Sequence, residues 1–271
     1  MRLGISSYTY VWAAGVPGYP PPPRPLTATQ LLGRADELGV RVVQIADNLP
    51  LDALSEPELD TLVRDASRRG IALEVGTRGV RPDHLRRYIA IAARLKSPIL
   101  RTVIDTADHE PSPDEVVALL SSVLPDFERA GVCLAIENHD RFKAAVLADI
   151  LGRISNGAVG VCLDTANSIG CLENLDTLLA HLGRWVVNLH VKDYCIFRPP
   201  HQKGFVVEGR PFGQGQLDVG TLLAAVRTIG RDMNAIVELW PPPEPTVMAS
   251  VAKEETWARE SVRYLRQFIS D

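Results

Sequence analysis

The chain has 271 residues, of which 46% are hydrophobic and 23% charged, so it can bury a sizeable core. Its 29 Lys and Arg residues are outnumbered by 33 Asp and Glu residues, and the net charge of −4 excludes the basic excess typical of nucleic-acid-binding proteins. The chain has no apolar run of about 18 residues and does not start like a signal peptide, so we expect a cytoplasmic protein that acts on a small molecule without a membrane.

Short runs rich in β-branched and aliphatic residues recur along the chain, separated by amphipathic segments. Runs such as VVQIA, VCLAIE and VVNLHV are apolar on both faces for most of their length, which is typical of parallel strands covered on both sides. We therefore predict strands at residues 3–7, 40–45, 72–75, 99–104, 133–137, 160–164, 186–191 and 235–239.

The segments between these runs have the features of helices. Thr27 with Gln30, and Ser112 with Glu115, have the spacing of a capping box, in which each side chain satisfies a backbone N–H group at the start of a helix. Alternating strands and helices without a linker predict an α/β fold, a single (β/α)8 TIM barrel domain over residues 1–271. An open parallel sheet is the alternative.

Two segments are too long for simple connections. Residues 16–25 contain a PPPP run, and residues 195–218 form a long polar stretch with four glycines. In a barrel, both are expected to rise over the face where the strands end, which is where active sites lie. Within the second segment we interpret GQGQ, residues 213–216, as a turn in preference to a phosphate-binding loop, because it does not open a helix directly after a strand.

The cysteines form no CxxC pair, and two of them lie in apolar runs. We interpret them as reduced core or loop residues without a redox or zinc role. They are Cys133, Cys162, Cys171 and Cys195.

Four residues able to bind a metal come at the ends of the last four predicted strands. They are Glu137, Asp164, His190 and Glu238. Taken singly, a carboxylate at a strand end can cap a helix and a histidine can be a core residue. Barrel geometry makes all four converge, and one cation would then satisfy them together. Three carboxylates and one imidazole suit Mn²⁺ best, with Mg²⁺, Co²⁺ and Zn²⁺ as alternatives.

In this order and context, the four motifs LAIENH, VCLDTAN, NLHVKD and AIVELW resemble those of the xylose isomerase-like barrel superfamily, specifically its sugar phosphate isomerase/epimerase group. The segment GRPFGQGQLD is also similar to a glycine-rich segment of many members. The resemblance implies that the four residues bind the metal and that Glu137 and Glu238 are the catalytic acid/base groups. Two departures leave the reaction open, because Asn167 stands where epimerases of the group often have histidine, and Gln44 where many members have glutamate.

Several further residues are candidates for binding the substrate. Lys192 could instead pair with Asp193 on the surface, and Trp12 could be core packing. The candidates are Tyr8, Trp12, Asn138, His139, Asn167, Lys192 and Arg198.

The function that these residues favour is a metal-dependent sugar isomerase or epimerase that acts on a ketose through an enediolate. A decarboxylase of a 3-oxo sugar acid is the alternative, because VVQIADNLPL, ENHDRF and DTANS resemble segments of such enzymes. A nuclease similar to endonuclease IV is remote, because it needs three metals and more than the six histidines of this chain. A non-catalytic binding module would not need two glutamates. The resemblance further suggests a homodimer or homotetramer.

Overall fold

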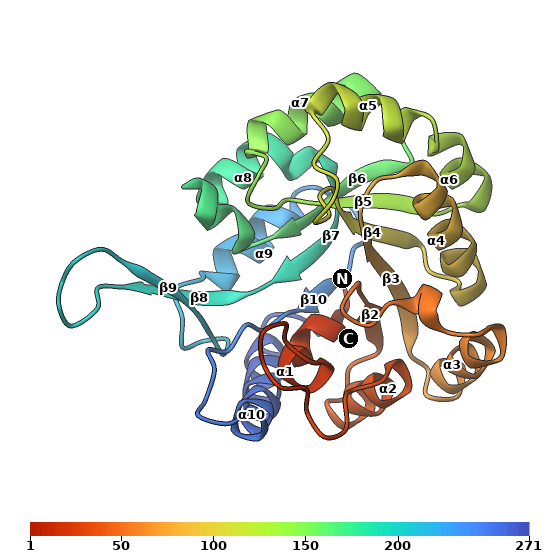
Figure 1. The fold of residues 1–271 in the computed structure, drawn as a ribbon. Helices are drawn as coiled ribbons and strands as arrows, with labels where there is room; N and C mark the ends of the chain where they lie inside the picture. Colours follow the sequence, from red (N-terminus) through yellow and green to blue (C-terminus); the bar gives the residue numbers. More distant parts are fainter. Residues whose placement is uncertain (271) are drawn as a thin grey trace.

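The computed structural model describes residues 1–270. Parallel strands close into a barrel in the order β1-β10-β7-β6-β5-β4-β3-β2 (Figure 1). The predicted TIM barrel and its strand positions are confirmed, although several ends shift by one to three residues, and Glu238 follows its strand instead of lying in it. The barrel strands are β1 Leu3–Ser6, β2 Val42–Ile45, β3 Ala72–Arg78, β4 Ile99–Val103, β5 Cys133–Glu137, β6 Val159–Asp164, β7 Val186–Val191 and β10 Ala235–Val237.

Helices surround the barrel (Figure 1). Both predicted capping boxes are present, at Thr27 with Gln30 and at Ser112 with Glu115. Within residues 1–270, no helix combines the length and the apolar character needed to cross a membrane. The α-helices are α1 Val11–Ala14, α2 Ala28–Glu37, α3 Glu56–Arg68, α4 Pro82–Leu95, α5 Pro113–Ser121, α6 Leu124–Ala130, α7 Ala144–Ile154, α8 Leu175–Leu182, α9 Val219–Arg227 and α10 Val247–Leu265. Short 3-10 helices are η1 Ser7–Tyr10, η2 Leu51–Ala53, η3 Asn167–Cys171 and η4 Gly183–Trp185.

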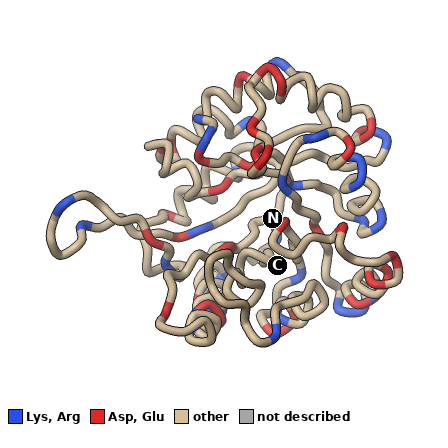
Figure 2. Tube along the Cα trace, in the orientation of Figure 1, with Lys and Arg blue, Asp and Glu red and all other residues tan. Residues whose placement is uncertain are grey.

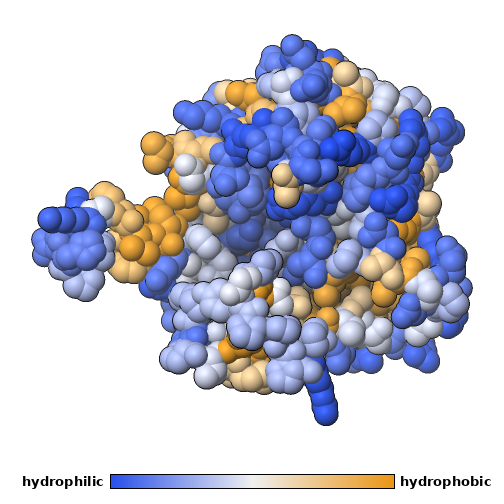
Figure 3. All heavy atoms as spheres, in the orientation of Figure 1, coloured by the Kyte–Doolittle hydropathy of each residue, from blue (hydrophilic) through white to orange (hydrophobic). Residues whose placement is uncertain are grey.

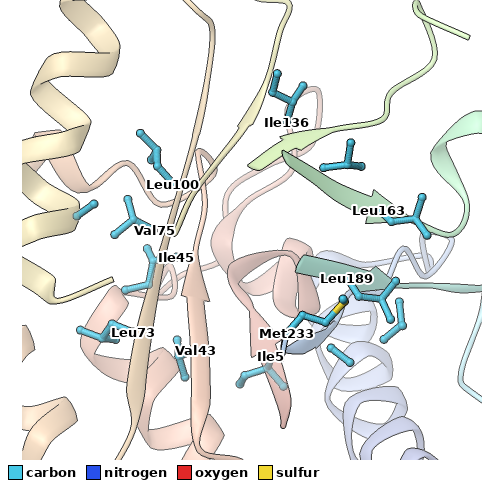
Figure 4. Close-up of a cluster of buried hydrophobic side chains, with 14 of the residues drawn as sticks. Ile5, Val43, Ile45, Leu73, Val75, Leu100, Ile136, Leu163, Leu189 and Met233 are labelled. Carbon is cyan, nitrogen blue, oxygen red and sulfur yellow. The ribbon is translucent and has the colours of Figure 1, made fainter. Parts of the chain in front are cut away.

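Successive residues of each strand point in opposite directions, one outward into the helix layer and the next inward into the barrel. The outward set forms the main apolar core, and Figure 4 shows Ile5, Val43, Leu73, Leu100 and Ile136 in this layer. The expectation that the strands are apolar on both faces for most of their length holds at inward positions such as Val42, Ala135 and Ile236, but other inward positions are polar. The buried polar residues that point inward are Ser6, Gln44, Glu74, Arg101, Glu137, Asp164, Asn188 and His190.

The stretch after β7 is not a simple loop. Strands β8 Asp193–Phe197 and β9 Val206–Arg210 form an antiparallel hairpin that projects from the barrel (Figure 1). Its loop carries the basic residues Arg198 and Lys203 (Figure 2). The hairpin has an apolar base in Figure 3, and Phe205 is 65% exposed. The prediction of a polar excursion is therefore corrected to a partly apolar hairpin.

Asp193 connects this hairpin to the glycine-rich segment. Its carboxylate accepts hydrogen bonds from the backbone N–H groups of Gly213 at 3.1 Å, Gly215 at 3.0 Å and Leu217 at 3.0 Å. A Cβ atom on Gly215 would collide with this carboxylate, so the close approach requires glycine. The interpretation of GQGQ as a turn is confirmed, and the alternative pairing of Asp193 with Lys192 is wrong.

Candidate active site

The four predicted metal ligands meet inside the barrel mouth. Their side chains are buried and are gathered around His190 Nδ1, which lies 3.1 Å from Glu137 Oε2, 3.3 Å from Glu238 Oε1 and 4.0 Å from Asp164 Oδ2. Strand pairing explains the arrangement, because β6 and β7 place Asp164 directly opposite His190, and the Glu238 N–H group donates to the carbonyl of Val191 on β7. The convergence expected from the strand ends is therefore present.

The donor set of this cluster fits a divalent cation. His190 Nδ1 is buried and has no hydrogen-bond partner within residues 1–270, although it faces three carboxylates. Asp164, His190 and Glu238 each offer a ligand atom, and these atoms all lie within 4.8 Å of one another. One imidazole nitrogen with several carboxylate oxygens is a donor set that first-row divalent ions accept. Such an ion would occupy the space that the unpartnered nitrogen faces.

Cys162 also lies near the cluster, within 4.8 Å of ligand atoms of Glu137 and His190. Its Sγ donates to Asn188 Oδ1 at 3.4 Å. Burial raises the pKa of the Cys162 thiol to about 11, which disfavours the thiolate form that binds metals. All four cysteines are free, as the sequence predicts.

Two cations, the buried Arg101 and the partly buried Lys192, are inserted among the carboxylates. Lys192 Nζ lies 2.8 Å from Asp164 Oδ2 and 3.0 Å from Glu238 Oε2. On the other side, Arg101 Nε pairs with Glu137 and Arg101 Nη1 lies 2.8 Å from Asp47 Oδ1. Lys192 was a predicted substrate-binding residue, whereas Arg101 was missed. Its signal in the sequence is an arginine within the apolar run ILRTV.

These ion pairs set the charge states of the site. Burial alone would raise the pKa of Glu137, but Arg101 and His190 hold it well below its ordinary value. Burial alone would lower the pKa of Lys192, but Asp164 and Glu238 hold it above its ordinary value. Glu137 is therefore a firmly ionised carboxylate and Lys192 a firmly charged ammonium.

Four of the remaining substrate candidates line two cavities, both of which Lys192 also lines. Tyr8, Trp12 and Asp47 line a cavity of about 620 Å³, and Lys192 lies at its edge. His139 and Asn167 line a second cavity of about 370 Å³, which Lys192 also lines. Figure 3 shows hydrophilic residues around a hollow on this face of the molecule.

Three of the lining residues are also engaged in the protein. Asn167 Nδ2 donates to Glu137 Oε1 at 2.7 Å, and the Tyr8 hydroxyl donates to Asp47 Oδ2 at 3.1 Å. The Trp12 indole N–H donates to the carbonyl of Pro241 at 3.0 Å, so this side chain is both packed and part of the cavity wall.

Two candidates lie apart from these cavity walls. Asn138 is buried, and its side-chain amide makes two hydrogen bonds with the backbone of Asp164. Its Nδ2 donates to the Asp164 carbonyl at 3.0 Å, and its Oδ1 accepts from the Asp164 N–H group at 2.7 Å. It thus fixes the ends of β5 and β6. Arg198 lies at the hairpin loop, where its guanidinium stacks over Phe205 at 4.3 Å.

The sequence profile of the xylose isomerase-like TIM barrel family matches residues 3–268. The chain belongs to this family. Within it, the 3-oxo-isoapionate decarboxylase of Pectobacterium atrosepticum is 36% identical over 265 residues, which are 98% of this chain and 95% of the relative.

Solved structures agree with the fold of this family. D-psicose 3-epimerase, crystallised in the presence of D-fructose, matches with a TM-score of 0.75 and 16% identity over 100% of both chains. The IOLI protein with a bound zinc atom matches with a TM-score of 0.71 and 17% identity, again over 100% of both chains. Likeness at this level of identity concerns the fold alone.

Proposed function

We propose that the chain is a divalent-metal-dependent decarboxylase of a 3-oxo sugar acid. The observation that carries the proposal is that both buried glutamates of the cluster are already paired with cations, Glu137 with Arg101 and Glu238 with Lys192. Such an arrangement suits a reaction that needs no free carboxylate base. The relative with 36% identity, which is named a decarboxylase of a 3-oxo acid, supports the same choice.

Glu137, Asp164, His190 and Glu238 would hold the metal, and Mn²⁺ stays the predicted ion. When bound, the cation would polarise a substrate carbonyl and favour the negative charge that develops on its oxygen. Lys192 adds a positive charge at the edge of both cavities, where its side chain is 14% exposed. Because ion pairs already fix Lys192 and Arg101, these charges need little rearrangement during the reaction.

Loss of CO₂ from a 3-oxo acid breaks the bond between the carboxylate carbon and its neighbour. The electron pair of that bond passes to the carbonyl as an enolate, and a proton from solvent later adds to the carbon. No step removes a proton from carbon, so neither glutamate acts as a base. The smaller cavity suits a departing CO₂, since Ala166, Ile169 and Trp240 line it with apolar side chains beside Lys192.

An isomerase or epimerase is the second candidate. Oxygens of Glu137 and Glu238 both lie within 3.3 Å of His190 Nδ1, so two carboxylates border the space that would hold the cation. In an epimerase they would take and return a proton. The low pKa of Glu137 weakens this candidate, because a carboxylate held ionised by Arg101 is a poor base.

Incubation with metal in D₂O separates the two reactions. Protein treated with EDTA and resupplied with Mn²⁺ is given a panel of 3-oxo sugar acids and, separately, a panel of ketoses, and NMR follows the products. We expect CO₂ release from a 3-oxo acid, with deuterium at the carbon that carried the carboxylate. Deuterium entry into a ketose without loss of carbon would instead establish the epimerase.

A further inference from the structure

A buried hydrogen-bond network lies inside the barrel beside the four predicted metal ligands, which we call the metal cluster: Glu137, Asp164, His190 and Glu238. Glu74 on β3 is only 2% exposed, and its Oε2 accepts from Gln44 Nε2 at 3.0 Å and from Asn188 Nδ2 at 3.1 Å. Its Oε1 accepts from Asn234 Nδ2 at 2.6 Å. All three of these partners are amide N–H donors, so both Glu74 oxygens act as acceptors and set which way the neighbouring amide groups face.

Gln44 on β2 links this carboxylate to the metal cluster. Its Nε2 donates to Glu74 Oε2 and also to Asn188 Oδ1 at 3.1 Å, which uses both hydrogens of the amide. Its Oε1 therefore faces His190 Nε2, at 2.6 Å. Because an amide oxygen is an acceptor, His190 Nε2 must carry the hydrogen of this bond.

The position of that hydrogen decides what the other ring nitrogen can do. A neutral imidazole with hydrogen on Nε2 has a lone pair on Nδ1. In this structure Nδ1 is the nitrogen that faces Glu137 and Glu238 at 3.1 and 3.3 Å and lacks a hydrogen-bond partner within residues 1–270. In the neutral ring, which is the form that binds a cation, the Glu74–Gln44 pair thus leaves the hydrogen on Nε2 and the lone pair on Nδ1, which faces the carboxylates.

We propose that Glu74 and Gln44 are positioning residues that select the His190 tautomer able to bind a divalent cation through Nδ1. The inference rests on the metal site of the proposed function and not on its reaction. If the Gln44 amide turned over, its oxygen would face the Glu74 carboxylate, acceptor against acceptor. Glu74 therefore prevents Gln44 from offering a donor to His190.

Glu74→Gln removes this selection with little change of shape. The new amide can donate to both Gln44 and Asn188, so these two amides can turn together. Gln44 can then donate to His190 Nε2, which moves the ring hydrogen to Nδ1 and blocks the cation. We expect the Kd for Mn²⁺, measured by calorimetry without substrate, to increase by about 10- to 100-fold. Ser97→Ala is the matched control, because Ser97 is a buried hydrogen-bonding residue beside β3 that does not contact this network, and its Kd should stay within about twofold of wild type.

The double variant Gln44→Glu/Glu74→Gln provides a rescue. It keeps one buried carboxylate but places it directly on His190 Nε2, where it again requires a donor. We expect its Kd for Mn²⁺ to return to within about fivefold of wild type, whereas a loss due only to disturbed packing would persist or worsen. ¹⁵N NMR of the Zn²⁺-loaded wild type should show the hydrogen of His190 on Nε2 and the metal on Nδ1.

The outcomes separate this inference from the proposed function. Equal Kd values for wild type and Glu74→Gln, a double variant no better than the single one, or a hydrogen on Nδ1 of the Zn²⁺-loaded protein would each overturn the positioning role. A wild-type protein that bound no divalent cation would overturn the metal-dependent function, and this inference with it.

Discussion

Arg101 and Lys192 compensate the negative charges of the carboxylates at the site. The three carboxylates of the metal cluster would repel one another if they were buried without cations. Arg101 bridges Glu137 and Asp47. Lys192 bridges Asp164 and Glu238. Removing a cation therefore leaves buried negative charge without compensation.

Arg101→Met should be strongly destabilising. Breaking a buried ion pair by removing one partner costs about 3–5 kcal/mol of unfolding free energy, and urea denaturation measures it. Arg78→Met is the matched control, because Arg78 also bonds Asp47, at 3.1 Å, but is about one-third exposed and does not contact Glu137. Its loss should cost about 1 kcal/mol or less. Equal losses for the two variants would contradict the assigned role of Arg101.

Lys192→Met should slow CO₂ release while leaving metal binding intact. Loss of a preorganised positive charge beside the reacting group lowers the rate by about 10²-fold or more. The Kd for Mn²⁺ should not increase, because Lys192 competes with the cation for Asp164 and Glu238. Lys203→Met in the hairpin loop serves as the control. An unchanged kcat in Lys192→Met would exclude Lys192 from the reaction.

Between elements, one contact ties α10 to the short helix after β1. Glu254 on α10 is fully buried and accepts hydrogen bonds from the backbone N–H groups of Trp12 at 2.7 Å and Ala13 at 2.6 Å. These N–H groups belong to the first turn of α1, so the carboxylate caps that helix. The contact holds Trp12 in the wall of the larger cavity.

The same contact predicts a pH dependence of stability. Burial raises the pKa of Glu254 from 4.5 to about 8, so the folded state holds this proton more tightly than the unfolded state. Its contribution to stability is full below about pH 4.5 and is lost as the pH rises through about 8. The unfolding free energy of wild type minus that of Glu254→Gln should therefore decrease between about pH 5 and pH 9. Parallel pH curves for the two proteins would contradict this.

For the whole molecule, metal binding should couple to stability. A cation that binds only the folded protein adds about 2.7 kcal/mol to the unfolding free energy at 100 times its Kd. We expect Mn²⁺ to raise the Tm of the EDTA-treated protein, and Glu238→Gln to reduce the shift. The same Tm shift in a variant lacking His190 would place the metal elsewhere.

The predicted homodimer or homotetramer stays a prediction that sedimentation velocity can test.

Much of this architecture could be predicted from sequence because its signals are local. The outward residues of each strand are apolar, so each strand forms a visible run, and the metal-binding residue types stand at strand ends that a barrel brings together. The inward polar residues could not be predicted as a network. Gln44, Glu74 and Arg101 are single polar positions within apolar runs, and their partners lie on strands far apart in the sequence.

The hairpin and the ion pairs were missed for the same reason. The polar residues and glycines of 195–218 obscure two short strands that pair only with each other. Lys192 and Asp193 are neighbours in sequence, but consecutive residues point in opposite directions, so Lys192 reaches Glu238 while Asp193 binds the turn at Gly215.

The most direct test of the metal centre is a crystal structure of the protein soaked in Mn²⁺, with anomalous scattering used to locate the ion. We predict one anomalous peak per chain, roughly 2.2 Å from His190 Nδ1 and from carboxylate oxygens of Glu137, Asp164 and Glu238. A peak at another site, or a peak bound through His190 Nε2, would contradict the account.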